Sequence, residues 1–111
     1  MPELLTLNCG YNDIQKLDIS KSPKLEELNA EMNFNLGNIN FSTCPALKSV
    51  NVRNASKINN VDVSKLPDLE YLGVEATGIS RIDVTKNANL KRLNCNYIRY
   101  LYMLDVTKDQ V

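Results

Sequence analysis

Hydrophobic residues recur along the chain at a spacing of 21 or 22 residues. The first unit starts at Leu4 and has apolar residues at its first, fourth and sixth positions. The same spacing begins again at Leu25, Leu47, Leu69 and Leu90. A fixed period of this length is typical of solenoids, in which each repeat packs only against its neighbours. We therefore expect a repeated surface and not a single catalytic pocket.

Each unit also has a second half with its own apolar spacing. In the first repeat this half contains Ile14, Leu17 and Ile19, with Asp18 between the last two. Equivalent segments begin at Leu36, Ile58, Ile79 and Leu101. Alternation of apolar and polar residues favours extended strands. No segment has a helical period, so we expect coils with short strands on two sides, six inward columns and little or no helix.

The unit resembles the leucine-rich repeat. More closely, it is similar to the short bacterial type with a recurring Leu-Asp-Val-Ser segment, seen here at Leu17–Ser20 and Val61–Ser64. Proline opens the first four repeats, at Pro2, Pro23, Pro45 and Pro67. The resemblance covers nearly the whole chain and points to internalin-like surface proteins. It implies right-handed coils, parallel strands and a cell-surface or secreted location.

The expected fold is a single, mainly β leucine-rich-repeat solenoid over residues 1–111. Its five repeats span about 2–22, 23–44, 45–66, 67–87 and 88–109. The family's turn-capping asparagine is present as Asn12 and Asn33, but Ala55, Thr77 and Ile98 replace it later. We expect the later turns to be held differently.

Charge and composition exclude several functions. The chain has 13 basic and 13 acidic residues and no histidine. The balanced charge gives no sign of the basic face of a nucleic-acid binder. Without histidine, the chain lacks the commonest general base and the commonest metal ligand. No apolar run approaches the roughly 18 residues of a membrane span, and no signal peptide is recognisable. We expect no enzyme activity, no cofactor, no nucleic acid and no membrane insertion.

The three cysteines do not predict a disulfide. Cys9 and Cys95 share an inward column four repeats apart, which places them about 19 Å from each other at about 4.8 Å per strand. A disulfide needs Cα atoms within about 7 Å. Cys44 lies in another column. We expect three free thiols, with Cys9 and Cys95 acting as small core residues.

Outward positions of the first strand form the face that leucine-rich repeats typically use for binding. Tyr, Arg and Met are the residue types enriched at protein interfaces. The candidate binding residues are Tyr11, Glu27, Glu31, Met32, Arg53, Tyr71, Glu75, Arg92 and Tyr97. The alternative is a solvated face on which Glu31, Arg53 and Glu75 satisfy one another in one column. Sequence alone favours neither.

Two polar columns have structural interpretations. An asparagine column, broken only at Gly73, could form a ladder of amides. An aspartate column suggests calcium, but each Asp precedes a Ser or Thr by two residues. Bonding to its own turn explains this pattern more simply, and we expect no metal site. The asparagines are Asn8, Asn29, Asn51 and Asn94, and the aspartates are Asp18, Asp62, Asp83 and Asp105, with Asn40 in the same column.

The fifth repeat carries Tyr100, Tyr102 and Met103 where the third has polar residues. We interpret them as a cap over the end or as an interface. Without a cap, we expect the bare ends of the solenoid to self-associate. The alternative is that the chain is a segment of a longer solenoid.

The favoured hypothesis is a non-enzymatic module of a bacterial surface or secreted protein that binds a protein or glycan. The alternative is a structural spacer without a ligand. The least favoured is a hydrolase using Glu31 and Glu75, because Arg53 lies between them on an open face.

Overall fold

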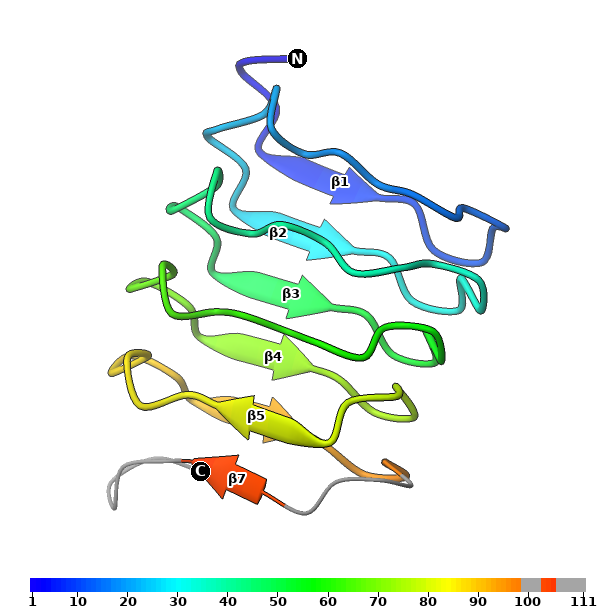
Figure 1. Cartoon of the computed structure of the whole chain (residues 1–111). Coiled ribbons are helices and arrows are strands. Elements are labelled where there is room, and N and C mark those ends of the chain that lie inside the picture. Colours follow the sequence, from blue (N-terminus) through cyan, green and yellow to red (C-terminus); the bar gives the residue numbers. More distant parts are fainter. Residues whose placement is uncertain (99–102, 106–111) are drawn as a thin grey trace.

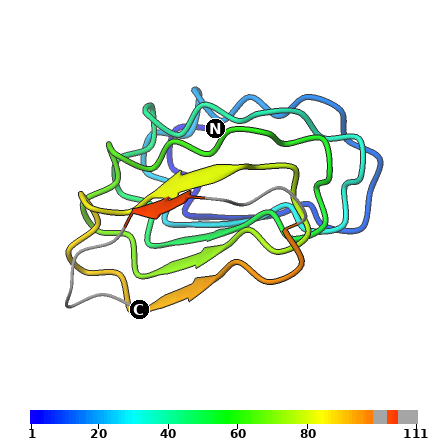
Figure 2. The same ribbon diagram turned by 60° about the horizontal axis from the view of Figure 1, so that its bottom comes forward.

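The first half of every coil contributes a strand to one parallel sheet. The computed structural model describes residues 1–98 and 103–105 and shows a flattened spiral (Figures 1 and 2). Leu7 lies opposite Leu28, which lies opposite Val50, so residues one repeat apart are direct neighbours. The five-stranded sheet has the order β1 (Thr6–Asn8), β2 (Glu27–Asn29), β3 (Ser49–Asn51), β4 (Tyr71–Gly73) and β6 (Arg92–Asn94).

Strands on the second side are fewer than the sequence predicts. Among the described residues only β5 (Arg81–Asp83) and β7 (Met103–Asp105) pair there, also in parallel. Between the second and third coils, the Asn38 side chain accepts the backbone N–H groups of Asn59 and Asn60, at 3.0 and 3.2 Å. A side-chain acceptor thus replaces a backbone carbonyl, which interrupts the regular ladder on this side.

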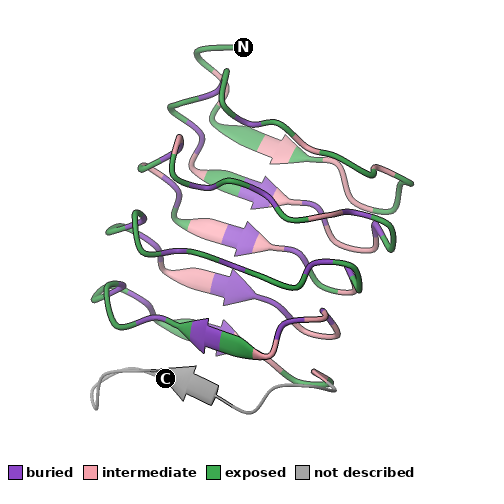
Figure 3. Ribbon diagram, in the orientation of Figure 1, coloured by how far each residue is buried: buried purple, intermediate pink, exposed green. Residues whose placement is uncertain are grey.

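The six predicted columns form the core between the two sides (Figure 3). In the central coils their members are almost fully buried, as at Leu28, Val50 and Leu72. In the first coil Leu4 and Leu7 are only half-buried, because no described coil packs above them. The described residues contain no helix, and therefore none that could cross a membrane. The predicted leucine-rich-repeat solenoid is confirmed.

Each strand of the main sheet is followed by one residue in the left-handed backbone region. Its φ lies between 54° and 63° in all five repeats, although none of these residues is glycine. For L-residues this conformation costs about 1–2 kcal/mol, and asparagine tolerates it best. Backbone bonds to the next coil hold it, as from Tyr11 N to the Glu31 carbonyl at 2.9 Å. The residues are Tyr11, Met32, Asn54, Ala76 and Tyr97.

The turns after these residues are held in different ways, as expected. Asn33 is fully buried and donates its amide to the carbonyls of Cys9 and Ala30, at 3.1 and 3.0 Å. In the fourth repeat Thr77 donates its hydroxyl to the Val74 carbonyl at 2.8 Å instead. The hydroxyl therefore replaces one bond of the missing amide.

Another set of buried side chains, which no sequence pattern predicts, joins coils at the opposite turn. The Cys44 thiol donates to the carbonyls of Ile19 and Ser22, both at 3.3 Å. Asn87 occupies the equivalent position two coils later and donates to Val63 and Leu66, both at 2.9 Å.

All three cysteines are free, as predicted. Cys9 and Cys95 pack against the core, as expected. Cys44 is the fully buried thiol, whereas Cys9 and Cys95 are half-buried near the two ends of the main sheet. Burial raises the pKa of the Cys9 thiol.

Candidate functional site

The outward side of the five-stranded sheet, which we call the strand face, carries most of the candidate binding residues. No described segment crosses this side of the sheet (Figure 2). Because the strands are in register, its side chains stand in columns that run across the coils. The columns are Thr6, Glu27, Ser49, Tyr71 and Arg92; Asn8, Asn29, Asn51, Gly73 and Asn94; and Gly10, Glu31, Arg53, Glu75 and Asn96.

Tyrosine and methionine line the edge of the strand face where the strands end. Tyr11 and Tyr97, in the first and last coils of this edge, are 70% and 87% exposed, and Met32 is half-buried in the coil next to Tyr11. The Asn54 amide contacts the Met32 sulfur at 2.9 Å. The left-handed backbone at this column turns these side chains to the rim of the face. The described residues thus place an aromatic and thioether edge beside polar columns.

The opposite edge, where the strands begin, is charged. Lys48 lies 4.0 Å from Glu26, and Lys91 lies 3.6 Å from Glu70. Exposed pairs of this kind contribute about 0–1 kcal/mol each. This alternating column is readable from the repeat spacing alone but is not among the predictions above. Its members are Glu26, Lys48, Glu70 and Lys91.

The remaining candidates fall into two groups. Glu27, Arg53 and Arg92 are exposed, whereas Glu31, Tyr71 and Glu75 are half-buried. The predicted column of Glu31, Arg53 and Glu75 is present in the structure, although the described contacts include no ion pair within it. Tyr100 and Tyr102 lie outside the described residues. Only the backbone of Met103 is described, in β7, so the cap remains a prediction.

The asparagine column does not form the expected amide ladder in the described structure. At Asn8, Asn29 and Asn51 the Oδ1 atom instead accepts the backbone N–H two residues later, as from Glu31 N to Asn29 Oδ1 at 3.0 Å. The same bond joins Asn8 to Gly10 at 3.2 Å. Local side-chain bonding of this kind competes with bonding between neighbours. At Asn8 and Asn29 this bond fixes the amide and leaves its Nδ2 donors available, whereas the amides of Asn51 and Asn94 donate to Glu31 and Tyr71.

Tyr71 explains why the asparagine column is broken at Gly73. A Cβ atom at position 73 would lie 2.6 Å from the Tyr71 hydroxyl and 3.1 Å from the Asn51 Oδ1. The Tyr71 side chain thus occupies the space that an asparagine would need. Its hydroxyl accepts a hydrogen bond from the Asn94 amide at 3.3 Å. Gly73 and Asn94 together fix this tyrosine on the strand face.

A shallow hollow of about 250 Å³ lies over β1 to β4, and we call it the strand-face hollow. Short side chains at Thr6 and Ser49 leave room beside Glu27, and Tyr71 forms one wall. It is lined by Thr6, Leu7, Asn8, Glu27, Leu28, Asn29, Ser49, Asn51 and Tyr71.

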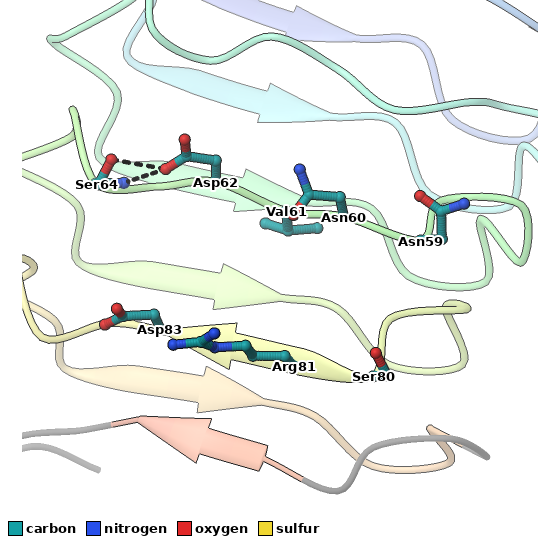
Figure 4. Close-up of a pocket in the computed structure, with 8 residues that line it drawn as sticks. All are labelled: Asn59, Asn60, Val61, Asp62, Ser64, Ser80, Arg81 and Asp83. Carbon is teal, nitrogen blue, oxygen red and sulfur yellow. Dashed lines mark hydrogen bonds between the residues drawn. The ribbon is translucent and has the colours of Figure 1, made fainter.

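A second hollow, of about 430 Å³, lies on the other side of the solenoid (Figure 4). Its two carboxylates are engaged by their own turns. Asp62 accepts the Ser64 hydroxyl at 2.7 Å, and Asp83 accepts the Thr85 hydroxyl at 2.7 Å. The predicted turn bonding is therefore confirmed at Asp18, Asp62 and Asp83, whereas the turn after Asp105 lies outside the described residues. The lining residues are Asn59, Asn60, Val61, Asp62, Ser64, Ser80, Arg81 and Asp83.

The same turn bonds lower the pKa of Asp18, Asp62 and Asp83. Hydrogen bonds from the following Ser or Thr side chain and backbone are the main cause. Nearby cations, such as Lys65 beside Asp62, add to the shift. Each carboxyl group makes stronger hydrogen bonds to its turn when it is charged than when it is protonated. These aspartates therefore stabilise the fold at pH values above the ordinary pKa of a carboxyl group. This stabilisation is lost as the pH falls through their lowered pKa values.

Changing all three aspartates to asparagine is expected to flatten the acid side of the stability–pH curve. Asparagine is compatible with this turn, because Asn40 already accepts the Ser42 backbone N–H at 3.0 Å and its hydroxyl at 2.7 Å. Urea unfolding at several pH values from neutral to acid would measure the slope. A variant with the unchanged acid slope of the parent protein would contradict this assignment.

Metal binding and hydrolysis find little support in this geometry. The described residues contain no group of three or more His, Cys, Asp or Glu side chains that could hold a metal ion. Of the two carboxylates proposed for hydrolysis, Glu31 accepts the Asn51 amide at 2.6 Å. That bond engages one oxygen of the Glu31 carboxylate on an open face.

Comparisons with known proteins connect this fold to bacterial proteins. No family model and no curated protein sequence matches the chain. Among solved structures, the functional domain of InlJ from Listeria monocytogenes, which includes a cysteine ladder, superposes with a TM-score of 0.81 and 28% identity over 84% of this chain. An internalin (InlF) from Listeria monocytogenes gives a TM-score of 0.64 and 16% identity over 96% of this chain.

The chain spans only part of both neighbours, 20% of the InlJ structure and 44% of the InlF structure. It also differs from InlJ in its cysteines. Cys9 and Cys95 share one column, but Ala30, Val52 and Val74 separate them, so this chain has no run of neighbouring cysteines.

Proposed function

From the internalin-like leucine-rich-repeat fold of this chain, we propose a non-enzymatic interaction module of a bacterial surface or secreted protein. The module binds a protein or glycan partner through the strand face. The observation that carries this proposal is the uncovered sheet, on which aromatic and charged side chains stand at fixed spacing. The similarity to InlJ and InlF supports the assignment to this class of bacterial protein.

The composition of the strand face supports binding. Interface hot spots are enriched in Tyr and Arg, surrounded by residues that exclude water. Tyr71 is held in place by Gly73 and Asn94, so little side-chain entropy is lost when a partner packs against it. Arg53 and Tyr97 are exposed at the C-terminal edge of the strands. These three residues are the anchors that we assign to the partner.

A capture experiment tests this proposal. Immobilised wild-type chain is expected to retain a partner from host-cell extract, and alanine at Arg53, Tyr71 and Tyr97 together is expected to abolish retention. The matched control changes Lys16, Lys57 and Lys86, which are exposed away from the strand face, and should leave retention intact. Thermal melts would confirm that both variants fold. Failure of the wild-type chain to capture any partner, or equal loss in both variants, would favour the spacer function.

A further inference from the structure

The strand-face hollow carries hydrogen-bond donors that the fold holds in place. The Oδ1 atoms of Asn8 and Asn29 accept backbone N–H groups at 3.2 and 3.0 Å. Within the described part of the chain, neither Nδ2 has a hydrogen-bond partner. Both amides are therefore oriented before any ligand arrives, and each has N–H groups to offer. Preorganised donors of this kind increase affinity because little entropy is lost on binding.

The hollow also carries an acceptor between two hydroxyl side chains. Register places Glu27 between Thr6 and Ser49 on the neighbouring strands. Glu27 is exposed, and the described contacts give its carboxylate no ion pair or hydrogen bond. A free carboxylate beside fixed amide donors matches adjacent hydroxyl groups on a ligand, since a hydroxyl both donates and accepts.

Tyr71 supplies the apolar part of the hollow. Its hydroxyl is held by Asn94, and its side chain lies against Gly73. The ring is thus available to pack against the carbon-bound hydrogens of a ligand. The other apolar lining residues are Leu7 and Leu28, and Leu28 is buried in the core beneath the sheet.

Size and charge narrow the class of ligand. At about 250 Å³ the hollow is smaller than the roughly 300–1,000 Å³ of pockets for drug-sized molecules. Protein partners usually anchor Trp, Tyr or Arg side chains in desolvated pockets. The lining of the strand-face hollow consists instead mainly of amide, hydroxyl and carboxylate groups. Glu27 on one side and Glu31 on the next column disfavour anionic ligands by charge repulsion.

We propose that the strand-face hollow binds one uncharged sugar residue of a glycan. Neighbouring hydroxyl groups of the sugar donate to the Glu27 carboxylate and accept from the amides of Asn8 and Asn29. Tyr71 stands on β4, two strands from Glu27, where it packs against the next residue of the same glycan. This inference rests on the proposed interaction function and names the ligand class of part of the same face.

Titration of the isotope-labelled full chain with single sugars tests the proposal. The probes are galactose, mannose and N-acetylglucosamine, with N-acetylneuraminic acid as the anionic comparison. At least one uncharged sugar is expected to shift backbone amide resonances of β1, β2 and β3 in a saturable manner, and the anionic sugar is not. If no uncharged sugar produces saturable shifts there, or if only the anionic sugar does, the proposal is wrong.

Two conservative variants separate recognition from folding. Asn29→Asp keeps the Oδ1 acceptor for the Glu31 N–H but removes the amide donor, and Glu27→Gln removes the carboxylate without changing its size. Each is expected to weaken sugar binding about tenfold, consistent with the loss of one hydrogen bond to a charged or fixed group. Asp68→Asn, which changes an exposed carboxylate outside the hollow and outside the candidate binding residues, is the control. Unchanged binding in Asn29→Asp and Glu27→Gln would overturn the assignment.

The outcomes distinguish this inference from the proposed function. If the wild-type chain captures a partner through Arg53, Tyr71 and Tyr97 but binds no sugar, only the sugar site is wrong. If neither capture nor sugar binding is observed, both proposals fail.

Discussion

Replacing Leu72 with alanine is expected to lower the free energy of unfolding by about 2–5 kcal/mol. Leu72 is fully buried in β4, and it stands between Val50 and Leu93 of the neighbouring coils. The truncated side chain leaves a cavity that two rigid strands cannot close. Urea unfolding gives the change in the free energy of unfolding directly, provided that this free energy falls with urea concentration at the same slope in the variant and the wild-type chain.

The same substitution at Leu7 is the matched comparison. Leu7 occupies the same column in the first coil, where it is half-buried and packs against the coil of Leu28 alone. We expect about half the loss or less, because only part of its apolar surface is removed from water. If the Leu7 and Leu72 variants lost equal stability, stacking between neighbouring coils would not be the main source of stability.

Introducing asparagine at Gly73 is expected to cost about 1–3 kcal/mol, as overpacking does in a tightly packed site. A Cβ atom there would lie 2.6 Å from the Tyr71 hydroxyl. The tyrosine must move, and it then loses the hydrogen bond from Asn94. Chemical unfolding measures the loss, and the tyrosine ring resonances would report the displacement.

A second change should relieve this strain. In β3 the equivalent pair is Ser49 and Asn51, in which a short side chain stands beside the asparagine. The double variant Tyr71→Ser with Gly73→Asn reproduces that pair. It should recover most of the stability lost in Gly73→Asn, with a coupling energy of about 1 kcal/mol or more. Additive losses from the two substitutions would refute the explanation of the broken column.

The apolar columns could be predicted from sequence because the buried positions recur at the same place in every coil. Leu28, Val50 and Leu72 are direct neighbours in the sheet, and the repeat spacing alone indicates this. The polar turn bonds of Asp62 and Asp83 could be predicted for the same reason, since the Ser or Thr follows at a fixed distance.

Other features depend on contacts that no single repeat reveals. The left-handed residues include Ala76 and Tyr97, whose side chains do not favour that conformation. At Ala76 a backbone bond from its N–H to the Asn96 carbonyl of the next coil, at 3.0 Å, holds it. The strand-face hollow arises where short side chains at Thr6 and Ser49 leave room beside Glu27 and Tyr71 forms one wall, a combination of residues from different repeats. Asparagine ladders were wrongly expected, because bonding to the chain's own backbone is more local than bonding between coils.

Hydroxyl-radical footprinting with a captured partner tests the central claim most directly. Tyrosine and methionine react readily with hydroxyl radicals, and Tyr11, Met32, Tyr71 and Tyr97 all lie on or at the edge of the strand face. The partner is expected to reduce oxidation at these four residues and to leave Met1, at the exposed N-terminal end, unchanged. Unchanged oxidation at the four residues in the presence of bound partner would contradict a binding function for the strand face.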